Sequence, residues 1–544
     1  RTVDVLVEAL GESDGFLRFK VIDALLRLRQ SHPEFTVAAD RVQPLLVQES
    51  NRYFSYLSLH YNLVRGQNGA NRPLLVRALE EKISRTVDRL YRLLGLLYPW
   101  KDISAARWAI EHGEPRIKAS AAEYLDNLLE TRVRSRVMPV LEDLPLDEKV
   151  RRGNALLRTR IRDTDDSLAQ LVHDEDHVVA AAAMLLVDRR GLWSSFSGDL
   201  EHALQHRDPR DWSVFEAASW VLAGGRLTEE QRRSRWLEPL PAVEIADRLA
   251  RLPLFADATV DELFRIARAG RQVRYEPGRR IYERLEHGAD LPFLLDGRIT
   301  LTTGDDASAA SGVEEIAAPA AFGFHEVFEG VPHRATASAQ GIAIVLTLRR
   351  EQFLGLLSEN VELAQGVFRT LIDGARRQSS AVTRAVVRPS LLATDGKPLQ
   401  AVEKALVLAE MPVLSRASSH QIAALAGIAH EVALIADDTV VAAGDPPSIH
   451  IVLGGELAVE RPDGTASVTA AAGDCTGLFE TLGSRTETGW RGHVARPGTA
   501  LRIERDALFD LLADHIDLLQ ALFGALERGR RGADPVEERS GSRQ

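Results

Sequence analysis

Cysteine is almost absent from this sequence of 544 residues, which contains a single one, Cys475. One thiol excludes an intramolecular disulfide, and because no cluster of cysteine and histidine at ligand spacing accompanies it, zinc fingers and zinc ribbons are excluded as well. We expect Cys475 to be a small buried hydrophobic side chain rather than a nucleophile. The sequence predicts no metal site and no cofactor.

An excess of positive charge and long apolar runs are also missing. The formal net charge is −11, whereas a nucleic-acid binder needs a basic face, so we expect no nucleic-acid partner. The apolar run AAAAMLLV at 180–187 is far shorter than the roughly 18 residues that span a bilayer, so we expect no membrane insertion by these residues. Because no nucleophile elbow, P-loop or dinucleotide-binding glycine motif is found, we expect no enzymatic activity.

Helical periodicity dominates the first half of the chain. The length of the whole chain, 544 residues, predicts about three compact domains of roughly 100 to 200 residues each. From residue 1 to 240 apolar residues recur every three or four positions, as in the stripe between 76 and 97 that Pro99 ends. This spacing predicts amphipathic helices nearly throughout, with the apolar stripe facing a core.

A helix motif recurs four times within this region. In each copy an acidic or proline-containing turn precedes a helix that carries small residues at helical spacing. The copies are SDGFLRFKVIDALLRL at 13, GEPRIKASAAEYLDNLL at 113, HDEDHVVAAAAMLLV at 173 and HRDPRDWSVFEAASWVL at 206. These segments resemble HEAT repeats, which implies a helical solenoid over 1–240 whose long surface docks a protein partner.

The second half of the chain alternates helices with strand patterns, and it repeats itself. RQVRYEPGRRIY, LPFLLDGRITLTT and GIAIVLTLRR read as strands between helices at 253–270 and 351–372. The same succession returns later in the chain. The turn at 254 has its counterpart 159 residues further on (413 minus 254), and the segment that begins at 346 has its counterpart 155 residues further on (501 minus 346). We therefore predict two α+β domains at 241–385 and 401–525, a linker at 386–400 that contains proline and glycine, and a disordered tail at 526–544.

Both units resemble cyclic-nucleotide-binding domains, which are helix-flanked jelly-roll β-barrels. The resemblance is carried by L-F at 254, Y-x-P-G at 275, F-L-L-x-G-R at 293, F-G at 322 and L-R-R-E-x-F at 348. In that family the loop after F-G carries a glutamate that accepts a hydrogen bond from the ribose hydroxyl, and an arginine that holds the cyclic phosphate. The resemblance thus implies a ligand-binding loop at FGFHEVFEGVPHRAT, residues 322–336.

The first loop departs from the family at both ligand positions. Counted from Gly323, the glutamate position is Phe324 and the arginine position is His333. Phenylalanine accepts no hydrogen bond, and an unperturbed histidine is mostly neutral at pH 7. Arg334 lies one residue late, so in an extended segment its side chain faces the other way. The candidate ligand-binding residues of this pocket are Gly323, Phe324, Glu326, His333, Arg334 and Ala335.

The loss of the arginine contact removes about 1.5 to 3 kcal/mol of binding free energy, which disfavours a cyclic-nucleotide ligand. The alternative is a shifted loop that recruits Glu326 and Arg334, which are eight residues apart where the family needs nine. The second copy departs further, because Gly477 is followed by Leu478, and Glu487 stands where the arginine is expected. A carboxylate at that position repels phosphate.

The order of the modules resembles the cytosolic regulatory portion of bacterial nucleotide-translocase-like transporter fusions. The chain opens on Arg1 without a methionine, and we expect it to continue a membrane transporter domain encoded upstream. The function expected is a non-enzymatic regulatory or scaffolding module with degenerate pockets, cytoplasmic and, as part of a longer protein, at the inner face of the cell membrane. The alternative is a genuine sensor of cyclic nucleotides or other small anions whose HEAT-like domain docks a partner.

Overall fold

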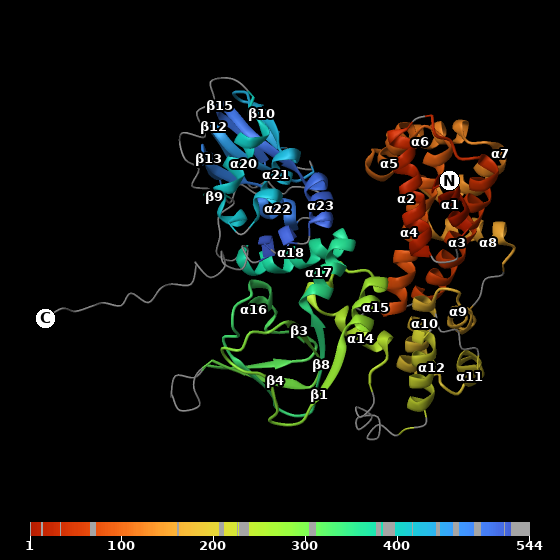
Figure 1. Cartoon of the computed structure of the whole chain (residues 1–544). Coiled ribbons are helices and arrows are strands. Elements are labelled where there is room, and N and C mark those ends of the chain that lie inside the picture. Colours follow the sequence, from red (N-terminus) through yellow and green to blue (C-terminus); the bar gives the residue numbers. More distant parts are fainter. Residues whose placement is uncertain are drawn as a thin grey trace. The chain divides into compact units, whose positions relative to one another are not determined.

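The chain divides into two compact units in the computed structural model, Arg1–Leu237 and Glu238–Gln544 (Figure 1). The structure describes residues 2–11, 15–32, 34–65, 72–159, 163–205, 212–225, 227, 239–303, 312–376, 382–384, 398–415, 417–441, 446–460, 467–483, 491–515, 517–519 and 521–523.

The regular elements described in the first unit are all helical. They are α1 (Thr2–Glu8), η1 (Ala9–Gly11), α2 (Gly15–Ser31), α3 (Ala39–Val64), α4 (Leu74–Leu97), α5 (Trp100–His112), α6 (Pro115–Leu128), α7 (Thr131–Leu141), α8 (Leu146–Leu157), α9 (Thr164–Val172), α10 (His177–Arg190), α11 (Ser197–Gln205) and α12 (Trp212–Gly225). The prediction of a helical N-terminal region is confirmed.

The helix boundaries follow local signals in the sequence. Asp176 caps α10 by accepting hydrogen bonds from the backbone N–H groups of Val178 and Val179, and Pro115 occupies the first turn of α6, where no N–H is needed. The four expected repeat helices correspond to α2, α6, α10 and α12. Their assignment as HEAT repeats stays a prediction.

The core of the first unit forms around the long helices α3 and α4, which pack against each other. A buried ionic cluster lies beside this core. Glu49 of α3 accepts from Arg18 Nη1 at 2.9 Å, from Arg52 Nη1 at 3.3 Å and from Arg89 Nε at 2.9 Å. Glu49, Arg18 and Arg89 are all buried, so this carboxylate compensates positive charge that water does not reach.

The second unit begins with a domain in which helices flank two four-stranded sheets. The leading helices are α14 (Ala242–Leu249), η4 (Pro253–Phe255) and α15 (Val260–Ala269). One sheet has the order β1 (Arg271–Tyr275), β8 (Ala343–Arg349), β3 (Asp290–Asp296), β6 (Ala320–Ala321), and the other β2 (Arg280–Tyr282), β7 (Thr336–Ala339), β4 (Arg298–Thr302), β5 (Val313–Ala317). Helices α16 (Phe324–Glu329), α17 (Arg350–Glu359) and α18 (Val361–Arg376) complete it.

A further set of elements follows with a similar order. Helices α20 (Ala401–Ala409), η5 (Pro412–Leu414) and α21 (Ser419–Ile428) precede β10 (His430–Leu434), β11 (Thr439–Val441), β12 (Ser448–Glu460), β13 (Ser467–Ala471), β14 (Asp474–Thr476), α22 (Leu478–Gly483), β15 (Arg491–Glu504) and α23 (Arg505–Asp514). The long strands β12 and β15 pair with each other and bend at register shifts. Strand β9 (Val382–Arg384) pairs with β14 of this sheet, although the sequence places it within 241–385.

The helix starts of the two sets match in detail. Thr259 forms a capping box with Glu262 at the start of α15, and Ser418 forms one with Gln421 at the start of α21. The two caps are 159 residues apart (418 minus 259), which is the offset of the sequence repeat. Most of the predicted linker and the whole predicted tail lie outside the described residues. Among the described residues, no helix combines the length and apolar composition needed to cross a bilayer.

Candidate ligand-binding site

The candidate site is the loop and short helix between strands β6 and β7. Gly323 precedes α16 with φ +63°, and Gly330 follows it with φ +68°. Both angles are left-handed, a region that glycine enters without the penalty that a Cβ brings. The glycines therefore bracket a helix of six residues, which turns the chain back toward β7.

Phe324 does not face a ligand. Its side chain is 7% exposed and meets Phe328 edge to face, with ring centroids 6.2 Å apart. Phe328 lies 5.9 Å from Phe353 of α17. The position that the resemblance assigns to a ribose-binding glutamate therefore belongs to an aromatic core between α16 and α17.

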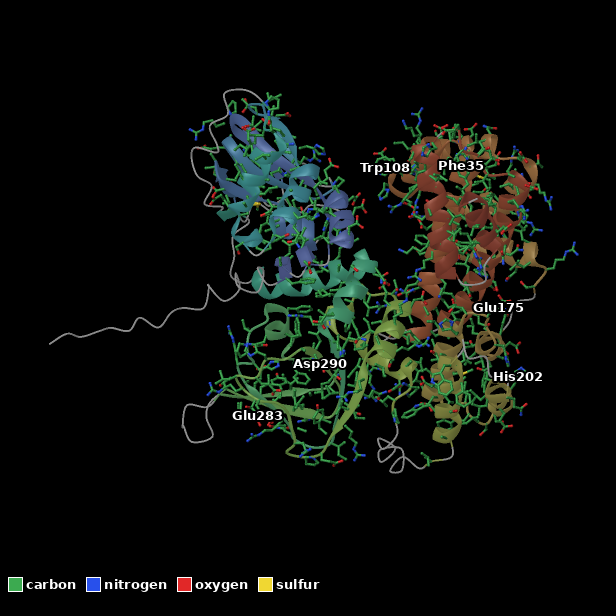
Figure 2. All side chains as sticks on the ribbon, in the orientation of Figure 1. Phe35, Trp108, Glu175, His202, Glu283 and Asp290 are labelled. Atoms are coloured by element: carbon green, nitrogen blue, oxygen red, sulfur yellow. The ribbon has the colours of Figure 1, made fainter. Side chains whose placement is uncertain are left out.

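His333 fills the interior of the loop. It is 3% exposed and stacks on Tyr282 of β2, with centroids 3.8 Å apart and ring planes inclined by 16°. Its backbone N–H donates to Glu286 O at 2.8 Å, and its carbonyl accepts from the Leu285 N–H at 2.8 Å. Glu283 and Asp290, labelled in Figure 2, stand at the two ends of the segment that carries these partners.

Gly288 makes room for this imidazole. A Cβ placed on Gly288 would lie 2.5 Å from His333 Nε2 and 3.2 Å from a Val327 methyl carbon. These separations are well inside van der Waals contact, so only glycine at 288 leaves the ring its place. The packing of His333 is thus built by three separate parts of the domain: β2, the 283–289 loop and α16.

The electrostatics favour the neutral form of His333. Burial lowers the pKa of this histidine, and the carboxylates of Glu326 and Glu286 offset part of that shift. Its Nδ1 is buried and makes no hydrogen bond with the residues that the structure describes. Burial, and secondarily Glu326, also raises the pKa of Tyr282, which keeps the phenol neutral. A neutral ring pair supplies no charge with which to hold a phosphate.

The remaining candidate residues of the first loop are arranged around this stack. Arg334 is exposed while its neighbour His333 is buried, and the chain bends at Arg334 before β7 begins at Thr336. Glu326 and Ala335 are half-buried. Glu326 lies close enough to influence both rings of the stack. The Glu326 carboxylate would therefore repel an anionic ligand bound at the stack.

The second loop has the same backbone start and a different lining. Gly477 has φ +80°, and its carbonyl accepts from Thr481 Oγ1 at 2.6 Å. Leu478 is buried, and Glu487 lies outside the described residues. Cys475 is buried, and burial raises its pKa to about 12, which keeps the thiol protonated. Among the described residues, no three histidine, cysteine or carboxylate side chains gather as a metal site would require.

Sequence reasoning did not single out Tyr282, Gly288 or His450. Tyr282 and Gly288 are 51 and 45 residues from His333, so no local pattern connects them with it. His450 of β12 is fully buried, and neither ring nitrogen makes a hydrogen bond of normal geometry with the described residues. It pairs across the sheet with Arg502 of β15 and with Thr476, which directly precedes Gly477.

The burial of His450 predicts that the domain formed by β10 to β15 loses stability at acid pH. Burial and the charge of Arg502 lower its pKa to about 4 from an ordinary 6.5, with a small opposing effect of the Ser448 backbone. Because the folded-state pKa lies below that of the unfolded chain, stability is complete above pH 6.5 and declines as the pH falls toward 4. The shift amounts to about 3 kcal/mol at 1.36 kcal/mol per pKa unit.

The test is calorimetric unfolding of the full chain between pH 7.5 and 4.5. His450→Leu should reduce the acid-induced decrease in the transition temperature, whereas His493→Leu, at an exposed position of β15, should not. An equal pH dependence in both variants would show that His450 is not the titrating group.

Comparison with known proteins supports the resemblance for part of the chain. Residues 272–360 match the family model of the cyclic nucleotide-binding domain. No curated protein matches the sequence.

Three similar solved structures have low sequence identity to this chain. The regulatory domain of Toxoplasma gondii PKA with cAMP is 14% identical, over 54% of this chain and 97% of that chain, with a TM-score of 0.21. The regulatory subunit of a cAMP-independent protein kinase A from Trypanosoma brucei is 18% identical, over 51% and 89%, with a TM-score of 0.23. The N-terminal domain of a transcriptional regulator from Streptomyces coelicolor A3(2) is 19% identical, over 24% and 90%, with a TM-score of 0.22. The family-model match identifies residues 272–360 as a cyclic nucleotide-binding domain.

Proposed function

We propose that this chain is a non-enzymatic regulatory module whose cyclic nucleotide-binding domain has lost tight nucleotide binding. The observation that carries the proposal is the buried stack of His333 on Tyr282, at the position where the family holds the cyclic phosphate with an arginine. A phosphate placed there would have to displace a packed ring and would find a carboxylate, Glu326, nearby. Phe324, turned into the core, leaves the ribose without its acceptor.

The second set of strands is proposed to be a degenerate copy of the same domain. The matching capping boxes of α15 and α21 support this. So do the left-handed glycines that precede both loop helices, Gly323 and Gly477. The buried Leu478 at the glutamate position argues that this copy does not bind nucleotide either.

A protein partner is proposed for the helical first unit, in a cytoplasmic setting. Trp108 of α5, labelled in Figure 2, is 63% exposed, and Ile117 and Tyr124 of α6 are exposed as well. The three side chains lie on helices that pack against each other, and contiguous exposed apolar patches are typical protein docking surfaces. The module would then change or position what it docks, through its contacts rather than through chemistry of its own.

Titration calorimetry with cyclic AMP and cyclic GMP at pH 7.5 tests the central proposal. We expect dissociation constants in the millimolar range, because the charge-assisted phosphate contact and the ribose acceptor are both lost. A dissociation constant below about 10 μM, or roughly −7 kcal/mol, would instead establish the alternative, a genuine nucleotide sensor.

The link to a transporter is a separate part of the proposal and has its own test. The reading frame upstream of Arg1 should encode several apolar segments of about 20 residues each. A start codon with a ribosome-binding site directly before Arg1 would make the protein a free scaffold, and would leave the conclusion about nucleotide binding untouched.

A further inference from the structure

The last described residues of the chain form an apolar helical segment. Residues 517–519 and 521–523 are helical, and we call 517–523, apart from residue 520, the C-terminal segment. Its apolar side chains are all buried, namely Leu518, Leu519, Ala521, Leu522 and Phe523. The sequence prediction places this segment within the second α+β domain at 401–525.

The aromatic residue of this segment packs against the first domain. The Phe523 ring lies 4.4 Å from Phe368 of α18 and 5.3 Å from Phe328 of α16, centroid to centroid. Phe523 is fully buried. Phe328 also meets Phe353 of α17. The loop helix of the cyclic nucleotide-binding domain therefore lies between α17 of its own domain and the C-terminal segment.

Helix α16 depends on such contacts for its position. Its six residues are too few to be stable alone, and its N-cap, Gly323, offers no side-chain hydrogen bond. What holds it is the burial of Phe324, Val327 and Phe328, together with a 3.3 Å hydrogen bond from Arg350 Nη1 to Val327 O. Phe328 contacts both Phe353 of α17 and Phe523 of the C-terminal segment, so both elements stabilise α16 through this residue.

Helix α18 connects the same region with the second loop helix. Arg369 of α18 donates from Nε to the carbonyl of Gly483, the last residue of α22, at 2.8 Å. The same guanidinium forms an ion pair with Asp257 of the first domain. Both loop helices are thus connected with α18. Helix α22 contacts α18 directly, and α16 is linked to it through Phe523, which contacts both Phe328 and Phe368.

We propose that the C-terminal segment is an internal ligand of the cyclic nucleotide-binding domain. It holds α16 against α18, and a partner that withdraws the segment frees the loop helix. The device works by packing alone, so it stands whether or not the loop binds a nucleotide. The regulated event is then a protein contact at the C-terminal segment, not the entry of a small molecule.

Hydrogen exchange of the full chain tests this coupling. Phe523→Ala should raise the exchange rate of the α16 amides, residues 325–329, at least tenfold. The matched control is Phe509→Ala, which removes an equally buried phenylalanine that contacts Phe368 at 6.2 Å from α23. In this control the α16 amides should change by less than threefold.

Two further variants guard against a general loss of structure. Phe523→Leu keeps an apolar side chain and should retain most of the α16 protection. Phe328→Ala should in turn raise the exchange rate of residues 517–519 and 521–523, because the contact is mutual. The proposal is wrong if α16 keeps its protection while the C-terminal segment exchanges freely in Phe523→Ala. It is equally wrong if Phe509→Ala exposes α16 as much as Phe523→Ala does.

Discussion

Phe324→Glu, which introduces the glutamate that the resemblance implies at this position, should destabilise the first α+β domain by about 3 to 5 kcal/mol rather than create a ribose acceptor. The phenylalanine is buried and packs on Phe328, so the substitution removes aromatic contacts and places a carboxylate in an apolar core. The group would be forced to take up a proton or to pull α16 out of place. Hydrogen exchange of β3 and β8, the central strands of this domain, measures the loss.

Phe324→Leu is the control for this prediction. It keeps an apolar side chain of similar reach and should lose far less stability than the glutamate variant. If Phe324→Glu is as stable as the unchanged protein and gains affinity for cyclic AMP, then position 324 can turn toward a ligand, and the packing described for α16 is not its working state.

Substitution Glu49→Gln should destabilise the helical first unit by about 3 to 5 kcal/mol. Glu49 is the carboxylate that Arg18, Arg52 and Arg89 share, and it is buried together with Arg18 and Arg89. Removal of its charge leaves guanidinium groups buried without their shared counter-ion, which is the costly way to break an internal ion pair. Arg18 responds most, because burial already lowers its pKa and Glu49 is what raises it again.

Tryptophan fluorescence during urea unfolding reports this change. Six of the seven tryptophans precede residue 238 and the seventh is Trp490, so the signal follows mainly the first unit. Asp143→Asn is the matched control, because its ion pair with Lys118 is long and its carboxylate is 73% exposed. It should change stability by less than about 1 kcal/mol. Equal effects of the two substitutions would mean that the Glu49 cluster is not a buried network in solution.

Much of the secondary structure was predictable because its signals are local. The stripe between 76 and 97 became α4, and Asp176 and Pro115 begin helices as capping rules require. The predicted strands at 271–282, 291–303 and 341–350 were found as β1 with β2, β3 with β4, and β8. Short strands such as β6, with two residues, were missed because so few residues carry no periodicity.

The register of the candidate site stays a prediction from the sequence, and its packing could not be predicted at all. The resemblance, counted from Gly323, assigns Phe324 and His333 to the ligand positions, and the sequence predicted different orientations for His333 and Arg334, which are buried and exposed respectively. The partners of these residues come from elsewhere: Tyr282 stacks on His333, and Gly288 makes room for it. The residues next to His333 do not indicate that it is buried, because its burial depends on strands that are distant in the sequence.

The sequence by itself determined which segments are helices and strands, and it predicted an internal repeat and the replacement of two ligand-binding residues. These features are encoded by residues within a few positions of one another, through backbone sterics, capping and periodic burial. Only the tertiary structure decided that Phe324 joins a core, that Glu49 gathers three arginines, and that Phe523 packs on α16 of the preceding domain. The physical reason is that the type of a side chain fixes only which kind of partner stabilises it when buried. Which residue becomes that partner depends on the surfaces that the folded chain packs together.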